Sequence, residues 1–189
     1  MKRGQLRVIG GFLGGRKLAV PLGRLVRPTA ERAREALFDL LGEGVQGATF
    51  LDGYAGTGAV GIEAFSRGAD RSSFIEADER AGDVLRRNLA IDASLAARSR
   101  LIVADLAEAL STLEQENVRF RIVFLDPPYG GELARGLRLV GESELLAPGG
   151  IVIGEHESGE TPPEIRSLVV RRTATYGRTA LTIYERARE

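Results

Sequence analysis

Residues 50–61 read FLDGYAGTGAVG, and this stretch decides the fold: an apolar run ends on Asp52, a glycine-rich loop follows, and a helix-like segment begins near residue 60. GTGAVG matches the GxGxxG motif, whose glycines let the backbone approach a ligand closely. Glu76 ends the next apolar run, about 20 positions later, where an acidic residue can bind ribose hydroxyls. The stretch predicts a pocket for a nucleotide or nucleoside cofactor and leaves the ligand open; the alternative is a tight turn that binds nothing.

Short apolar runs alternate with helix-like segments on both sides of this loop. Strands are predicted at 49–52, 73–76, 101–104, 122–126 and 151–155, and helices near 60–67, 80–91, 106–114 and 132–146. This alternation predicts an α/β fold with a doubly wound, mainly parallel sheet. The runs 168–176 and 179–185 are separated only by Gly177 and Arg178, so they are predicted to form an antiparallel hairpin at an edge of that sheet.

The N-terminal part has a different pattern. Strand-like runs at 6–9 and 16–20 flank GGFLGG and predict a hairpin. A helix is then expected to start with Thr29 as its N-cap and to end at Gly42 and Gly44. We therefore expect residues 1–44 to form an extension and residues 45–189 to form the main domain.

Charge is unevenly distributed along a chain whose net charge is zero. Residues 1–34 carry nine basic side chains and one acidic side chain, a charge of +8, and the remainder carries −8. A basic N-terminal segment on an acidic body can bind phosphate at one surface while repelling it elsewhere. A solvated basic segment without a partner is the equally weighted alternative.

Composition excludes several classes of chemistry. The 189 residues include no cysteine and one histidine, which excludes disulfides and thiolate nucleophiles and leaves few ligands for a metal site, so no metal is expected. His156 lies between two glutamates and is expected to have a structural or substrate-edge role. No apolar run is long enough to span a bilayer or to act as a signal peptide, so a cytoplasmic protein is expected.

The segment Asp126-Pro127-Pro128-Tyr129 directly follows the apolar run 122–125. Two prolines cannot continue a central strand, so the chain must leave the sheet and present Asp126 at its carboxyl edge. Ligands bind at this edge in open α/β sheets. A loop without function is the alternative, but the position after a strand and the following aromatic residue favour a functional site.

These residues resemble a known family. DPPY after the fourth strand, with D-x-x-A-G-T-G after the first, is similar to the class I S-adenosylmethionine-dependent methyltransferases that modify exocyclic amino groups of bases. The further segments LRVIGGFLGGRKLAVP, VRPT with RAREALF, LLAPGG, EH and YGRTAL resemble the RsmD family across essentially the whole chain. That family methylates N2 of one guanine in 16S ribosomal RNA. Gly53 and Tyr54 depart from it, because a larger apolar residue followed by Phe or Cys is expected there.

The resemblance implies a Rossmann-like, seven-stranded sheet and assigns roles to individual residues. It implies that Asp52 and the loop around Gly56 and Gly58 contact the methionine part of S-adenosylmethionine, and that Glu76 binds the ribose. Asp105 is expected to accept from the adenine amino group, or alternatively to cap the helix that follows it. The expected cofactor-binding residues are Asp52, Gly53, Tyr54, Ala55, Gly56, Gly58, Glu76, Ala77, Asp105 and Leu106.

The resemblance also implies how the target base is held. Asp126 and the Pro127 carbonyl are expected to accept the two N2–H bonds of guanine while Tyr129 stacks on the base, with Pro128 completing the catalytic motif. The partner is expected to be 16S ribosomal RNA or the assembling small subunit, and the protein is expected to be a monomer that uses neither a membrane nor a metal. The expected RNA-binding residues are Arg7, Arg16, Lys17, Arg27, Arg32 and Arg34.

Three other functions stay open at this point. DPPY also suits an adenine-N6 methyltransferase of DNA or RNA, although the N-terminal match disfavours it. GTGAVG with Glu76 suits an NAD-dependent oxidoreductase but leaves DPPY unexplained. The basic segment suits an RNA-binding protein without a cofactor.

Overall fold

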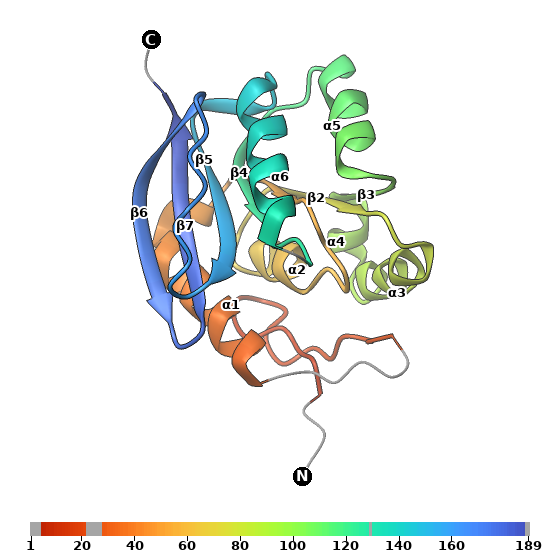
Figure 1. Cartoon of the computed structure of the whole chain (residues 1–189). Helices are drawn as coiled ribbons and strands as arrows, with labels where there is room; N and C mark the ends of the chain where they lie inside the picture. The colour runs from red at the N-terminus through yellow and green to blue at the C-terminus, as the bar shows by residue number, and fades with distance from the viewer. Residues whose placement is uncertain (1–4, 22–27, 129, 188–189) are drawn as a thin grey trace.

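The computed structural model describes residues 5–21, 28–128 and 130–187 (Figure 1). Seven strands form one sheet in the order β3-β2-β1-β4-β5-β7-β6. The first five pair in parallel, and β7 runs antiparallel to both β5 and β6. The strands are β1 (Thr49–Asp52), β2 (Arg71–Glu76), β3 (Ser99–Val103), β4 (Phe120–Leu125), β5 (Leu146–Glu157), β6 (Leu168–Tyr176) and β7 (Thr179–Arg186).

Helices cover both faces of the sheet (Figure 1). One face packs against α5 and α6, and the other packs against α1, α2, α3 and α4. The helices are α1 (Pro28–Leu41), α2 (Ala59–Ser66), α3 (Glu79–Leu89), α4 (Ala93–Ala97), α5 (Leu106–Gln115) and α6 (Gly130–Glu142). A 3₁₀ turn, η1 (Gly42–Val45), follows α1.

Alternate residues of the strands supply the two layers of the core. On β1, Phe50 packs in the cluster that contains α1, whereas Leu51 packs in the cluster that contains α5 and α6. Both side chains are fully buried. Successive side chains of a strand point to opposite faces, so a strand covered by helices on both sides is expected to be mainly apolar. This explains why the central strands appear in the sequence as continuous apolar runs.

The predicted fold class is confirmed, including the parallel strands and the C-terminal hairpin at one edge. The last predicted helix was too long, because α6 ends at Glu142 and the chain already pairs as β5 from Leu146, opposite Phe120. The short helix α4 was not predicted. It is capped by Asp92, whose side chain accepts from the amides of Ser94 and Leu95.

The N-terminal segment folds back on itself without forming two regular strands, so that prediction was wrong in detail. One antiparallel bridge joins Arg7 and Lys17, and the amide of Leu18 donates to the carbonyl of Leu6 at 2.9 Å. At the glycine-rich tip of this segment, Gly11 and Gly15 both adopt positive φ. Apolar side chains of this segment enter the cluster formed by α2 and α3. The expected N-cap Thr29 has a side chain outside the described residues.

None of the helices in the described ranges is long and apolar enough to cross a membrane.

Candidate cofactor and catalytic site

The glycine loop between β1 and α2 is held against the end of β2. The amide of Ala55 donates to the carbonyl of Ile75 at 2.9 Å, and the amide of Gly58 donates to the carbonyl of Ala55 at 2.7 Å. Gly58 has a φ of +78°, and a Cβ atom there would lie 2.1 Å from the Leu85 side chain on α3. Only glycine fits this position, because a side chain would meet both backbone strain and a steric clash.

Glu76 closes the loop from the end of β2. Its Oε2 accepts from the amide of Gly56 at 2.7 Å, and its Oε1 accepts from the amide of Asp78 at 2.8 Å. A carboxylate oxygen can accept about two hydrogen bonds, so each oxygen retains capacity for a ligand hydroxyl. Glu76 is half-buried at the carboxyl edge of the sheet, as expected for a ribose-binding residue.

Asp52 lies beneath the same loop. Its side chain is 2% exposed, and its Oδ2 accepts from the amide of Gly61 at 3.0 Å. The pKa of Asp52 is raised to about 7, mainly by burial. The hydrogen bond from Gly61 opposes this rise, and the nearby charges of Asp126 and Glu76 add to it. An acid in this state is well suited to a cationic ligand, which would favour its ionised form.

Asp126 directly follows β4, next to the glycine loop. The amide of Gly53 donates to the carbonyl of Phe124 at 2.9 Å, which ties the start of the loop to the end of β4. Asp126 is exposed at the surface, yet the surrounding protein removes enough water to raise its pKa to about 6. Pro127 and Pro128 follow it out of the sheet, and Tyr129 lies outside the described residues.

Glu155 is a site residue that the sequence analysis did not select. Leu125 of β4 pairs with Gly154 of β5, so Asp126 and Glu155 are the next residues on two neighbouring parallel strands. Burial and the charge of Asp126 raise the pKa of Glu155 to about 8. The available signal was an acidic residue at the end of an apolar strand, but strand neighbours cannot be assigned from one sequence. His156 follows Glu155 in the chain. Its Nδ1 lies 3.0 Å from the Glu157 carbonyl oxygen, and its Nε2 lies 2.8 Å from Thr182 Oγ1.

Asp105 caps α5, which is the alternative considered from the sequence. It accepts from the amide of Ala107 at 2.9 Å and pairs with Arg135 of α6 at 3.2 Å. The hydrogen bond with Arg135 is the main contact that lowers the pKa of Asp105, and the hydrogen bond from the Ala107 amide lowers it further. Leu106 beside it is buried, and Ala77 is exposed near Glu76. The capping contact leaves lone pairs for a ligand donor, so both roles remain compatible.

The departure at Gly53 and Tyr54 has a local cause. A Cβ atom on Gly53 would lie 2.6 Å from Cδ2 of Leu125, so a larger residue there would require the Leu125 side chain to move. The Tyr54 hydroxyl is buried without a hydrogen-bond partner among the described residues, and burial raises its pKa. A buried polar atom normally finds a partner, so this hydroxyl has unused capacity beside the loop.

The expected RNA-binding residues fall into two groups. Arg7, Arg16, Lys17 and Arg32 are exposed, and Arg27 lies outside the described residues. Arg34 is only 5% exposed, and its Nε donates to Glu63 at 2.8 Å while its Nη2 donates to the Arg7 carbonyl at 2.7 Å. Its expected contact with RNA is therefore corrected, because a buried, paired guanidinium cannot reach a phosphate.

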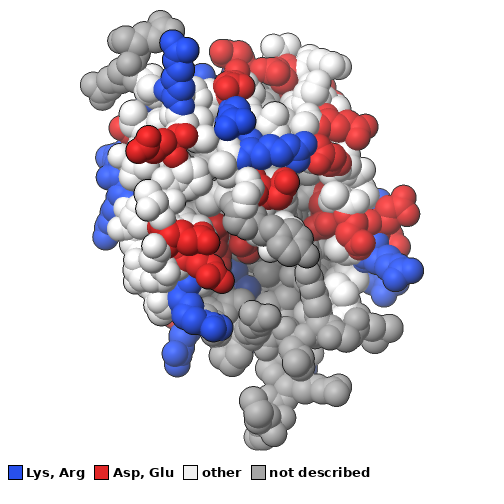
Figure 2. Space-filling model, viewed as in Figure 1, with Lys and Arg blue, Asp and Glu red and all other residues white. Residues whose placement is uncertain are grey.

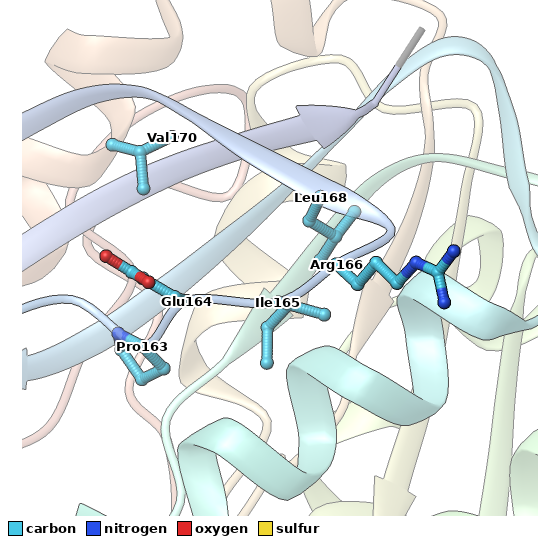
Figure 3. Close-up of a pocket in the computed structure, with 6 residues that line it drawn as sticks. All are labelled: Pro163, Glu164, Ile165, Arg166, Leu168 and Val170. Carbon is cyan, nitrogen blue, oxygen red and sulfur yellow. The ribbon is translucent and has the colours of Figure 1, made fainter. Parts of the chain in front are cut away.

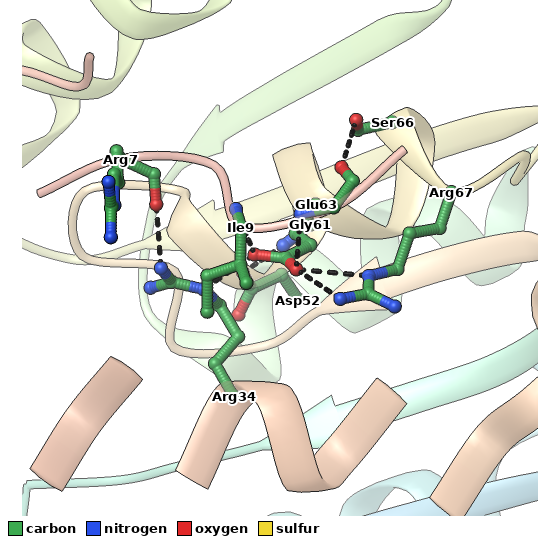
Figure 4. A network of polar contacts seen from close by, with 9 residues as sticks. Arg7, Ile9, Arg34, Asp52, Gly61, Glu63, Ser66 and Arg67 are labelled. Carbon is green, nitrogen blue, oxygen red and sulfur yellow. Dashed lines mark hydrogen bonds and ion pairs between the residues drawn. The ribbon is translucent and has the colours of Figure 1, made fainter. Parts of the chain in front are cut away.

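Glu63 of α2 is the centre of the network that holds Arg34 (Figure 4). It is fully buried and also pairs with Arg67 at 2.9 Å. The amides of Ile9 and Gly10 each donate to it at 3.2 Å. Four donors from three parts of the chain thus compensate one buried carboxylate and join α1, α2 and the N-terminal segment.

The charges separated along the sequence are not separated over the visible surface. On the face seen in Figure 2, acidic and basic side chains are interspersed across the described residues. A shallow pocket at the β6 edge, shown in Figure 3, contains none of the expected site residues. Within the described ranges, no group of three or more His, Cys, Asp or Glu side chains is arranged to hold a metal ion. The cluster of functional interest is therefore the carboxyl edge around Asp52, Glu76 and Asp126.

The chain is similar to known proteins over nearly its whole length. A family model described as Conserved hypothetical protein 95 matches residues 6–185. Ribosomal RNA small subunit methyltransferase D of Escherichia coli (strain K12) is 36% identical over 185 residues, covering 97% of this chain and 91% of the relative. The solved structure of the Escherichia coli protein yhhF has a TM-score of 0.83 at 35% identity, covering 97% of this chain and 98% of that chain.

A more distant structure shares the fold. The RNA methyltransferase from Salinibacter ruber, solved in complex with S-adenosyl-L-homocysteine, has a TM-score of 0.62 at 21% identity and covers 83% of this chain and 92% of its own. The resemblance drawn from the sequence is confirmed by the family match and the curated relatives. This chain belongs to the RsmD family, whose model is described as Conserved hypothetical protein 95.

Proposed function

We propose that this protein transfers a methyl group from S-adenosylmethionine to the exocyclic N2 of a guanine in 16S ribosomal RNA. The observation that carries the proposal is the position of Asp126, which leaves β4 directly beside the glycine loop. Membership of the RsmD family supports ribosomal RNA as the substrate class. It also favours methyl transfer over the NAD-dependent oxidoreductase considered from the sequence.

The residues around the glycine loop fit S-adenosylmethionine. Glu76 retains acceptor capacity for ribose hydroxyls after binding the amides of Gly56 and Asp78. Buried Asp52 offers a carboxylate to the α-ammonium group of the methionine part. Leu106 and Ala77 supply apolar atoms for the adenine ring, with Asp105 at its edge. When bound, the cofactor supplies a methyl group on an electron-poor sulfonium.

Asp126 and Pro127 then prepare the amine for attack. The lone pair of a guanine amino group is delocalised into the ring, so the nitrogen is a weak nucleophile. Acceptance of its two N–H bonds by the Asp126 carboxylate and the Pro127 carbonyl localises that pair on nitrogen. The nitrogen forms a bond to the methyl carbon as the carbon–sulfur bond breaks, and the amine then loses a proton. The Asp126 carboxylate, which accepts one of the N–H bonds, is the group proposed to receive it.

The target guanine must leave its stack before it reaches Asp126. Base amines in paired RNA are buried in the helix, so enzymes of this type act on unpaired or extruded nucleotides. The exposed Arg7, Arg16, Lys17 and Arg32 are the described candidates for holding the flanking phosphates. The RNA substrate is either free 16S ribosomal RNA or the assembling small subunit.

Transfer of a radiolabelled methyl group tests the proposal. Ribosomal RNA and small subunits that lack the modification are incubated with the protein and labelled S-adenosylmethionine, and the nucleosides are then separated. Label in N2-methylguanosine from 16S RNA is the expected result. Label in N6-methyladenosine identifies the adenine-N6 alternative, and absence of transfer to any ribosomal RNA contradicts the proposed activity.

A further inference from the structure

We propose that Asn88 is a positioning residue that joins the N-terminal segment to the glycine loop and thereby sets the affinity for the cofactor. Asn88 belongs to α3 and is only 1% exposed. Its Nδ2 donates to the carbonyl of Thr57 at 2.8 Å and to the carbonyl of Ala19 at 3.0 Å. Its Oδ1 accepts from the amide of Ala19 at 2.7 Å. One side chain therefore holds two backbone segments that are far apart in the sequence.

The pattern of contacts requires an asparagine. The carboxamide has two N–H donors and one acceptor oxygen, and all three functions are used here. An aspartate would direct a carboxylate at two carbonyl oxygens, and an aliphatic residue would leave the buried carbonyls without donors. The same face of α3 carries Leu85, one turn earlier, whose side chain packs against Gly58. Thus α3 restrains two successive residues of the loop, one by packing and one by hydrogen bonding.

The middle of the loop is held by residues of β2 and of α3. Glu76 and the Ile75 carbonyl fix Gly56 and Ala55 from β2, and Asn88 fixes Thr57 from the opposite side. A loop held in its binding conformation costs less ordering free energy when the ligand arrives. Because Asn88 also binds both polar backbone groups of Ala19, ordering of the loop and ordering of the segment around Ala19 favour each other. Such a coupling is reciprocal: the cofactor must stabilise the segment to the extent that the segment strengthens cofactor binding.

The inference rests on the proposal that the glycine loop binds S-adenosylmethionine, and two measurements test it. Cofactor dissociation constants are measured by calorimetry, and backbone hydrogen exchange of the peptide around Ala19 is followed with and without cofactor. In the wild type, the cofactor is expected to slow exchange in this peptide. Asn88→Ala is expected to raise the dissociation constant by roughly fivefold, the effect of one ordinary hydrogen bond, and to abolish the cofactor-dependent protection.

Two further variants separate positioning from general stability. Asn88→Asp retains the acceptor for the Ala19 amide but loses both donors, and it should weaken cofactor binding to at least the same extent. Ser66→Ala is the matched control, because Ser66 Oγ binds the same N-terminal segment at the Leu13 amide (2.9 Å) and the Gly10 carbonyl (2.6 Å) without contacting the glycine loop. It should loosen residues 10–13 while leaving the contacts between Asn88 and Ala19, and therefore cofactor affinity, unchanged.

Three outcomes overturn the inference: unchanged cofactor affinity in both Asn88 variants, unchanged cofactor-dependent protection in them, or an equal loss of affinity in Ser66→Ala. Failure of the wild type to bind S-adenosylmethionine overturns this inference together with the proposed function. Binding of the cofactor by a wild type that methylates a different base overturns only the guanine-N2 proposal.

Discussion

Glu76 Oε2 lies 2.7 Å from the amide nitrogen of Gly56, a residue 20 positions earlier in the chain. The hydrogen bond ties the end of β2 to the middle of the glycine loop, so one carboxylate shapes the loop and also faces the expected ribose position. The loop and its acidic partner are therefore a single unit, and a change at Glu76 affects both the loop conformation and the ligand contact.

Glu76→Ala is expected to weaken S-adenosylmethionine binding by roughly 1.5–3 kcal/mol, which is the scale of hydrogen bonds to a charged group. Isothermal calorimetry measures the change. Glu79→Ala, an exposed carboxylate at the start of α3, serves as the control and should bind the cofactor normally. Unchanged affinity in Glu76→Ala would count against the ribose role.

Asp126→Asn is expected to lower methyl transfer by at least about 100-fold, because the amide no longer offers a full carboxylate to the N2–H bonds. Cofactor affinity should stay within a few-fold of the wild type, since Asp126 is assigned to the base. Single-turnover transfer and calorimetry provide the two readouts. Glu157→Gln, on the exposed end of β5, is the matched control. If affinity and transfer fell together by the same factor, Asp126 would belong to the cofactor site instead.

Cofactor affinity is expected to rise with pH. Asp52, Asp126 and Glu155 have raised pKa values of about 7, about 6 and about 8, so in the protein without cofactor these acids gain protons as the pH falls from about 8 to about 6. A bound cation favours their ionised forms and releases protons, so the dissociation constant should fall between about pH 6 and about pH 8.

S-adenosylhomocysteine lacks the sulfonium charge and provides the comparison for this pH dependence. Its affinity should rise less over the same interval, because it stabilises the carboxylates less. Calorimetry in buffers of different ionisation enthalpy counts the released protons for both compounds. Identical pH profiles for the two would mean that the sulfonium does not lie near these acids.

The double variant Arg16→Ala, Lys17→Ala is expected to weaken RNA binding and reduce its dependence on salt. Each lost phosphate contact lowers the slope of log affinity against log salt by roughly 0.7–0.9. The variant Arg171→Ala, Arg172→Ala removes the same charge from β6 and should keep the wild-type slope. An unaltered slope in the Arg16 and Lys17 variant would show that this segment does not contact RNA.

Arg34→Ala is expected to lower the free energy of unfolding by about 3 kcal/mol, because it leaves the buried Glu63 carboxylate without one of its partners. Denaturant unfolding measures the loss. The salt dependence of RNA binding should not change, which distinguishes a structural arginine from one that binds phosphate. A reduced salt slope with normal stability would restore Arg34 to the RNA surface.

Local patterns in the sequence were sufficient for much of the fold. The apolar runs predicted the strands because a strand buried on both faces is mainly apolar. The glycine loop, Glu76 and the two prolines after Asp126 predicted a site at the carboxyl edge, because each feature marks the end of a strand. The two-residue link at Gly177 and Arg178 predicted the C-terminal hairpin. Each of these patterns involves residues that are close together in the chain, so it can be recognised in a single sequence.

Contacts between distant segments could be seen only in the tertiary structure. Arg34 looked like one more basic residue, but the approach of α1 to α2 buries it against Glu63, 29 positions away. Glu155 lies at the candidate site because β5 pairs with β4. Asn88 joins the N-terminal segment to the glycine loop because its side chain contacts both Ala19, 69 positions away, and Thr57. The periodicity of a sequence records which face of an element is buried, whereas the partner that covers this face depends on how all the elements pack together.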